Sequence, residues 1–156
     1  MSGAADDRPV ARRTVDELLG EARARIARLT PAETLAAAHT GAAIVDIRTA
    51  ADRERTGVVP GSLHVPRTVL EWRLDPASEW RSPYAPALDR QVVVLCDHGY
   101  SSSLAAAVLV ELGFERAGDV IGGFEAWRAA GLPIAPAPPP PAPGAPAGMA
   151  PAEPGP

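Results

Sequence analysis

The chain has 156 residues, which is enough for one domain with one hydrophobic core. Its formal net charge is −4, which argues against a nucleic-acid partner, because such a partner requires a basic face. A single cysteine excludes an internal disulfide framework and a zinc site built from several thiolates. The sequence has no run of about 20 apolar residues for a membrane helix and no apolar signal-peptide core, so we expect a cytoplasmic protein without a membrane partner.

The two ends of the chain differ in composition from its middle. Residues 1–12 are mostly polar, and residues 135–156 are almost entirely Pro, Ala and Gly. Neither segment has enough apolar side chains to offset the entropy lost on ordering, so we expect a disordered N-terminus and a disordered tail that acts as a spacer. A ligand for a proline-binding module is the alternative for the tail. Between the ends we expect N-terminal helices over residues 13–41 that pack on a main domain of residues 42–134.

Two helices are expected before the main domain. Over residues 14–29, apolar residues recur at nearly helical spacing with charges between them, which predicts one long helix. Thr30, Pro31 and Glu33 predict the start of a second helix, with Thr30 as its N-cap, Pro31 in its first turn and Glu33 completing a capping box. Gly41 is expected to end this second helix.

Strands and helices then alternate along the main domain. Short apolar runs predict strands over residues 43–47, 63–65, 91–95 and 119–121, and helices are predicted over residues 102–112 and 124–130. This alternation predicts the α/β class, with a mainly parallel sheet covered by helices on both faces. Sites in such sheets form beyond the carboxyl ends of the strands, and Cys96 directly follows the most apolar strand.

The residues from Cys96 to Ser102 form a predicted strand–loop–helix junction. A short turn of this kind directs several backbone N–H groups into one concavity, with the positive end of the helix behind it, and both stabilise a thiolate. Gly99 is expected to take a positive φ, and the serines at positions 101–103 are expected to include the N-cap of the helix. The alternative is that Cys96 is a small hydrophobic residue that closes a buried strand.

Two other kinds of cysteine chemistry fit this loop less well. A cysteine phosphatase needs an arginine six residues after the cysteine to bind phosphate, and Ser102 occupies that position here. A thioredoxin-like redox role needs a second, resolving cysteine, which the sequence lacks.

Four stretches of the sequence resemble the rhodanese-like sulfurtransferase domains, over about residues 42–133. They are residues 44–48, 56–66, 92–102, and the pair 113–114 with 122–127. The resemblance implies a sheet of about five strands flanked by helices. It also implies a reaction without a cofactor, in which a cysteine thiolate takes the outer sulfur of a donor such as thiosulfate and passes it to an acceptor.

The resemblance also assigns roles by position. Cys96 would be the nucleophile that carries the sulfur as a persulfide. The residues that would hold the anionic sulfur with their backbone N–H groups are Asp97, His98, Gly99, Tyr100, Ser101 and Ser102. The implied partners are a small-molecule or protein sulfur donor and a thiol or cyanide acceptor, while the oligomeric state is left open.

Two positions in the loop depart from the family pattern. Many members have basic residues directly after the cysteine and five residues after it, where this sequence has Asp97 and Ser101. A carboxylate at the mouth of the site repels the thiosulfate dianion by about 1 kcal/mol at ~4 Å in water. We therefore predict that a neutral or protein-borne persulfide is a better donor than thiosulfate. The alternative function is a non-catalytic rhodanese-like module that binds a protein or senses redox state.

Several charged residues near the first strand of the main domain receive structural interpretations. Asp46 and Arg48 are expected to form an ion pair or a hydrogen-bonded turn at the end of the strand. Arg53, Glu54 and Arg55 are expected on a solvated helix face.

The histidines and tryptophans are interpreted individually. His64 is expected to be a satisfied structural histidine, whereas His98 either faces solvent or acts beside the thiol. Trp72, Trp80 and Trp127 are expected to serve in packing. The three histidines are scattered without metal-ligand spacing, so we expect no metal.

Overall fold

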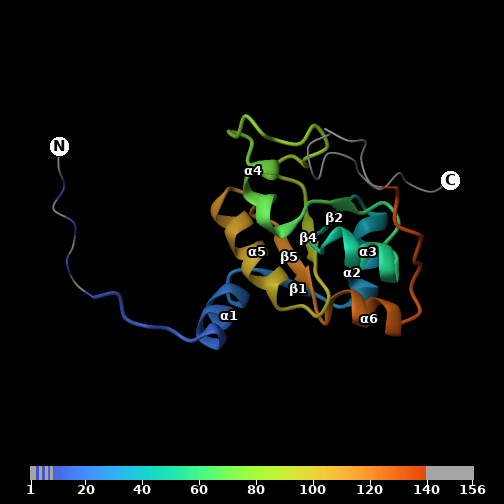
Figure 1. Cartoon of the computed structure of the whole chain (residues 1–156), viewed down its shortest axis with the longest axis horizontal. Coiled ribbons are helices and arrows are strands. Elements are labelled where there is room, and N and C mark those ends of the chain that lie inside the picture. The colour runs from blue at the N-terminus through green and yellow to red at the C-terminus, as the bar shows by residue number, and fades with distance from the viewer. Residues whose placement is uncertain (1–2, 4, 6, 8, 140–156) are drawn as a thin grey trace.

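Strands and helices alternate along the chain as the apolar pattern predicts, and they form a five-stranded parallel sheet (Figure 1). The structure is a computed structural model that describes residues 3, 5, 7 and 9–139. In chain order its elements are α1 (Val15–Arg23), β1 (Ala27–Leu29), α2 (Pro31–His39), β2 (Ala43–Asp46), α3 (Ala50–Thr56), β3 (Leu63–His64), the 3₁₀ turn η1 (Arg67–Val69), α4 (Leu70–Leu74), β4 (Val92–Leu95), α5 (Ser101–Glu111), β5 (Ala117–Val120) and α6 (Gly123–Ala129).

The sheet has the strand order β1-β5-β4-β2-β3, and all neighbouring strands are parallel. The central strand β4 is buried along its whole length, and its side chains alternate between two cores. Val94 and Cys96 face the core under α5, whereas Leu95 faces the core that contains Phe124 and Trp127. This alternation places the cysteine on one defined face of the sheet.

The helices cover the two faces in two groups. Figure 1 shows α1, α4 and α5 on one side of the sheet and α2, α3 and α6 on the other. The predicted α/β class with a parallel sheet covered on both faces is therefore confirmed. The carboxyl ends of β2 and β4 lie at the same edge of the sheet, where the loops after these two strands meet.

The start of α2 matches its sequence prediction. The Thr30 hydroxyl accepts a hydrogen bond from the Glu33 amide, and the Glu33 carboxylate accepts one from the Thr30 amide, both at 3.1 Å. Pro31 is at the first helical position. These contacts satisfy donors that the helix itself leaves without partners, and so the capping box is confirmed.

The prediction of one long helix over residues 14–29 is wrong. The helix α1 ends at Arg23, and residues 27–29 form β1, which pairs in parallel with β5 at the edge of the sheet. The Leu29 carbonyl accepts a hydrogen bond from the Ile121 amide at 2.8 Å. The edge of the sheet thus gives these residues backbone partners, which outweigh the helical spacing of their side chains. The last strand, β5, also begins two residues earlier than predicted.

After α6 the chain returns to the β2–β3 side of the sheet. Val58 and Ala135 form an isolated antiparallel bridge with N···O distances of 2.8 and 2.9 Å. Of the predicted tail, residues 140–156 lie outside the described part, as do residues 1, 2, 4, 6 and 8 of the predicted N-terminal segment. In the part of the chain that is described, no helix is long and apolar enough to cross a membrane.

Candidate active site

Cys96 lies at the floor of a cavity at the carboxyl edge of the sheet. Its residue exposure is 6%, and the cavity has a volume of about 330 Å³. The lining residues come from the loops after β2 and β4 and from the first turn of α3 and α5; they are Ile47, Arg48, Thr49, Asp52, Cys96, Asp97, His98, Tyr100 and Ser101. A small molecule that enters this cavity therefore meets the only thiol of the chain.

Donors from the loop converge on the Cys96 sulfur. The Gly99 amide lies 3.1 Å from Sγ and donates a hydrogen bond to it. Burial of the thiol is the largest single influence on its pKa and raises it, but the hydroxyls of Ser102 and Ser101 and the amides of Ser102 and Gly99 act in the opposite direction. Together these donors outweigh burial, so the pKa of Cys96 lies below its ordinary value and the thiolate is favoured.

The loop directs its carbonyl groups away from the sulfur. The Cys96 carbonyl accepts a hydrogen bond from the Phe124 amide at 2.8 Å, and the Asp97 carbonyl accepts one from the Glu125 amide at 3.1 Å. Gly99 has a φ of +82°, as predicted, and a Cβ at this position would lie 2.8 Å from the Gly122 amide nitrogen. The loop is thereby fixed against the first turn of α6 with its amides turned toward Cys96.

The serines after the loop do not form the predicted N-cap. The N-cap of α5 is Tyr100, without a side-chain hydrogen bond, and Ser102 and Ser103 instead donate to the buried Asp119, each at 2.7 Å. The single proton of the Ser102 hydroxyl is donated to Asp119, although the hydroxyl also lowers the pKa of Cys96. The Gly99 amide has no such competing acceptor and is the steadier donor to the sulfur.

The predicted ion pair of Asp46 and Arg48 is present beside the cavity. Arg48 Nη2 lies 2.9 Å from Asp46 Oδ2, and the guanidinium carbon lies 3.9 Å from the centre of the Phe124 ring. Arg53, which was predicted to be solvated, is instead buried with its Nε 3.1 Å from Asp46 Oδ2. His64 is satisfied as predicted, because its Nε2 lies 2.8 Å from the Arg48 carbonyl.

Two carboxylates lie at the mouth of the cavity. Burial is the main cause that raises the pKa of Asp97, and the neighbouring Asp52 raises it further through its charge and a hydrogen bond. Arg48 opposes this effect, with its Nη1 3.9 Å from Asp97 Oδ1. Arg48 and Arg53 share Asp46, and Arg55 Nη2 lies 2.9 Å from Asp52 Oδ1, so Asp97 is the carboxylate of this group without a cation at hydrogen-bond distance.

Most of the loop residues predicted to bind substrate line the cavity. Asp97, His98, Tyr100 and Ser101 line it directly, with His98 and Tyr100 exposed, whereas Gly99 and Ser102 are not in the lining and act on the sulfur through their amides. The sequence interpretation missed Thr49 and Asp52. Their signal was a position in the loop and first helical turn that follow β2, a parallel strand that neighbours β4.

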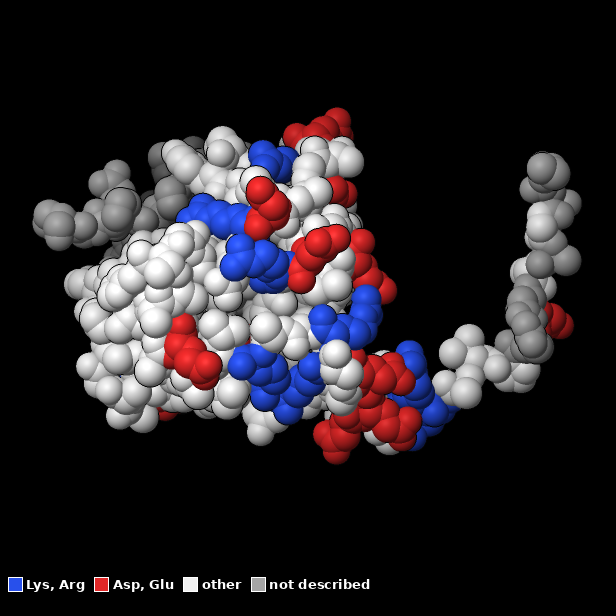
Figure 2. All heavy atoms as spheres, turned by 180° about the vertical axis from the view of Figure 1, so that it is seen from behind, with Lys and Arg blue, Asp and Glu red and all other residues white. Residues whose placement is uncertain are grey.

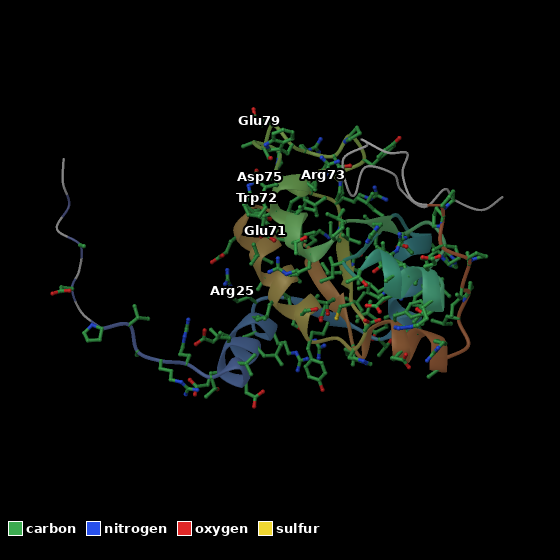
Figure 3. The ribbon with its side chains drawn as sticks, viewed as in Figure 1. Arg25, Glu71, Trp72, Arg73, Asp75 and Glu79 are labelled. Carbon is green, nitrogen blue, oxygen red and sulfur yellow. The ribbon has the colours of Figure 1, made fainter. Side chains whose placement is uncertain are left out.

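The tryptophans divide into two kinds. Trp127 is fully buried and packs in the core as predicted. Trp72 and Trp80 are 55% and 60% exposed, so their predicted packing role is wrong. Figure 3 shows Trp72 at the outer edge of the molecule with Glu71 and Asp75. The short helix α4 buries Leu70 and Leu74 against α5, which leaves Trp72 on its outer side.

The family model described as "Rhodanese-like domain" matches residues 30–130. The chain belongs to the rhodanese family. The thiosulfate sulfurtransferase GlpE of Pseudomonas savastanoi pv. phaseolicola is 36% identical over 102 residues, which cover 65% of this rhodanese and 87% of that protein. GlpE of Vibrio cholerae serotype O1 is 56% identical over a shorter segment, which covers 30% of this chain and 43% of that one.

A solved structure supports the same fold. It is the Rhodopseudomonas palustris protein RPA3614, described as a protein of unknown function and a possible tyrosine phosphatase. It is 36% identical to this rhodanese with a TM-score of 0.74, and the match covers 82% of this chain and 98% of that one.

Proposed function

We propose that this rhodanese-like sulfurtransferase takes a sulfane sulfur from a donor onto Cys96 and passes it to a thiol or to cyanide. The observation that carries the proposal is the set of donors directed at a cavity-floor cysteine whose pKa lies below its ordinary value. A thiolate is the nucleophilic form of cysteine, so the same contacts that lower the pKa raise the reactive fraction at neutral pH.

The first step makes one sulfur–sulfur bond and breaks another. The Cys96 thiolate attacks the outer sulfur of the donor, and the bond between the two donor sulfurs breaks. The inner sulfur leaves with the electron pair, as a thiolate from a persulfide or as sulfite from thiosulfate. The amides of Gly99 and Ser102 then hold the Cys96 persulfide anion in the way they hold the thiolate.

In the second step the acceptor attacks the outer sulfur of the persulfide. The bond between this sulfur and Sγ breaks, and the electron pair returns to Cys96 as a thiolate. Cyanide becomes thiocyanate and a thiol becomes a persulfide. No oxidant or reductant is consumed over the two steps, because the sulfane sulfur changes only its partner.

The preferred donor is a neutral or protein-borne persulfide rather than thiosulfate. Asp97 and Asp52 line the cavity; Asp52 is paired with Arg55, whereas Asp97 lies 3.9 Å from Arg48, which is closer to Asp46. A dianion is repelled by the Asp97 carboxylate more strongly than a neutral or singly charged donor. Turnover should therefore be faster with glutathione persulfide than with thiosulfate at equal concentration, and the reverse order would contradict this choice of donor.

Intact-mass measurement tests the sulfur-transfer step. The protein is incubated with thiosulfate or with glutathione persulfide, and the expected product is heavier by one sulfur atom. Cyanide should remove the added mass, and the Cys96→Ala variant should gain none. If no donor produced the adduct, the non-catalytic module would become the better interpretation.

A phosphatase activity is less well supported, although the words "possible tyrosine phosphatase" describe one relative. The loop from Cys96 to Ser102 contains no arginine, and Arg48 is occupied by Asp46. The phosphoryl dianion would lack a bidentate partner in this cavity. Release of nitrophenol from p-nitrophenyl phosphate by the wild type, but not by Cys96→Ala, would favour the phosphatase interpretation.

A further inference from the structure

Two arginines from outside the cysteine loop share one carbonyl of that loop. The Gly99 carbonyl accepts a hydrogen bond from Arg23 Nη2 at 2.8 Å and another from Arg28 Nη2 at 3.1 Å. Arg23 is the last residue of α1, and Arg28 is the middle residue of β1. Both therefore precede residue 30, where the match to the rhodanese model begins.

The same glycine contacts the nucleophile with its other polar group. The Gly99 amide donates to the Cys96 sulfur, while the Gly99 carbonyl receives the two guanidinium groups. Two cations on a carbonyl oxygen hold the glycine, and with it the amide, in one orientation. They also place positive charge on the carbonyl side of the Gly99 peptide, where both side chains are half-buried and their charge is only partly screened.

A buried carboxylate fixes one of these arginines but leaves an excess of positive charge. Arg28 Nε lies 2.9 Å from Asp119 Oδ1, and Asp119 is fully buried. Arg23 donates only to neutral oxygens among the described residues: the Gly99 carbonyl and, at 3.1 Å, the Ser103 hydroxyl. Arg23, Arg28 and Asp119 together therefore carry a net charge of +1.

We propose that Arg23 and Arg28 are positioning residues that supply, from the N-terminal segment, the positive charge that stabilises the Cys96 thiolate. The loop itself has Asp97 directly after the cysteine and Ser101 five residues after it, and so contributes no cation from these positions. The arginines act through the Gly99 peptide rather than by touching the substrate. Their effect on the persulfide rests on the proposed sulfur transfer, whereas their effect on the thiolate does not.

The test measures the rate of Cys96 alkylation by iodoacetamide as a function of pH, in Arg23→Gln and in Arg28→Gln. Only the thiolate reacts, and the chain has one cysteine, so the profile reports the pKa of Cys96 alone. Each substitution should raise that pKa and lower the alkylation rate near pH 7 by about threefold to tenfold. Arg23→Lys and Arg28→Lys retain the charge and should restore most of the rate.

Arg25→Gln is the matched control. Arg25 lies on the same N-terminal segment, but it pairs with Glu111 at 3.3 Å, and both side chains are exposed. Figure 3 shows Arg25 at the outer edge of the molecule, and Figure 2 shows many charged side chains of both signs gathered around the N-terminal helix. The control should leave the alkylation profile unchanged, because an exposed pair is screened by solvent and Arg25 makes no hydrogen bond to the cysteine loop among the described residues.

Three outcomes would overturn the proposal. The first is an unchanged profile in both glutamine variants, and the second is a lysine variant that loses as much rate as its glutamine counterpart. The third is an equal loss in Arg25→Gln. If removal of the Asp119 partner unfolds Arg28→Gln, Arg23→Gln decides the test, since Arg23 pairs with no carboxylate in the described part of the chain. Absence of a persulfide in the wild type would reject the proposed function but not the alkylation result.

Discussion

Cys96 receives hydrogen bonds from hydroxyl groups and from backbone amides, and these two kinds of donor respond differently to mutation. A serine hydroxyl can be removed by substitution with alanine, whereas the amide remains. The Ser102 hydroxyl donates to Asp119 at 2.7 Å and also lowers the pKa of Cys96. Removal of this hydroxyl therefore measures its effect on the thiolate while the backbone amides stay in place.

Ser102→Ala should raise the pKa of Cys96 and slow its alkylation near pH 7 by about threefold to tenfold, because the thiolate loses one donor. Ser62→Ala removes an equally buried hydroxyl that donates to the Val59 carbonyl, and it should leave the profile close to that of the wild type. The measurement is the pH dependence of alkylation by iodoacetamide. An unchanged profile in Ser102→Ala would mean that the Ser102 hydroxyl serves Asp119 and not the thiolate.

Asp97→Asn should raise kcat/KM for thiosulfate by about fivefold, because removal of one negative charge at the mouth relieves a repulsion of about 1 kcal/mol. The gain should be smaller with glutathione persulfide, so the ratio of the two values is the quantity to measure. Glu54→Gln, an exposed substitution on α3, is the control and should leave the ratio unchanged. An unchanged ratio in Asp97→Asn would mean that the charge of Asp97 does not determine the preference between the two donors.

At the scale of elements, the position of β1 depends on the absence of a side chain from β5. A Cβ on Gly118 would lie 2.3 Å from the Ala27 carbonyl oxygen, so only glycine allows the two strands to pair. The strand β1 in turn carries Arg28 to the Gly99 carbonyl. The position of the edge strand β1 thus affects the cysteine loop through the hydrogen bond from Arg28.

Gly118→Ala should displace β1, lower the free energy of unfolding by about 1–3 kcal/mol and raise the pKa of Cys96. Gly20→Ala is the matched control, since a Cβ there meets no atom within 4 Å and lies in a helix, where alanine is favoured. Urea unfolding gives the first quantity and alkylation the second. A destabilised Gly118→Ala protein with an unchanged alkylation profile would show that β1 does not influence the thiol.

At the scale of the whole molecule, the buried His64 makes stability depend on pH. Burial is the main cause that lowers the pKa of His64, and it outweighs the hydrogen bond to the Arg48 carbonyl, which raises it. The folded chain therefore binds this proton less readily than the unfolded chain. Stability from this source is fully present above the unfolded value of about 6.5 and is lost as the pH falls through the lower folded value.

His64→Gln should reduce the loss of unfolding free energy between about pH 7.5 and pH 5, by about 1.4 kcal/mol for each unit by which the folded pKa is lowered. The measurement is urea unfolding at the two pH values. His39→Gln, an exposed substitution at the end of α2, should retain the dependence of the wild type. A larger loss of stability at low pH in His64→Gln would contradict the assigned direction.

The features that the sequence predicted well depend on neighbours in the chain. The capping box of Thr30 and Glu33 spans one helical turn, and the positive φ of Gly99 is set by the turn in which it lies. The features that it missed depend on partners that the local pattern does not reveal. Residues 27–29 pair with β5, 91 residues later in the chain, and Arg53 is buried because its guanidinium reaches back to Asp46, seven residues earlier.

The candidate site divides in the same way. The loop from Cys96 to Ser102 is continuous in sequence and could be predicted from its residues and from the resemblance. The opposite wall, with Thr49 and Asp52, required the order of the strands, because β2 lies next to β4 only in the folded sheet. Local sequence rules thus predicted the nucleophile and the loop that surrounds it, but not the residues that form the opposite wall of the cavity.

The location of Arg23 and Arg28 also bears on how such a domain can be moved between proteins. The match to the family begins at residue 30, after both arginines and the whole of β1. A gene fusion that transferred only the matched segment would carry the cysteine loop without its two external cations and with an unpaired edge on β5. The transferable unit of this rhodanese therefore starts at α1, and recombination inside its first 29 residues would separate the nucleophile from part of its electrostatic support.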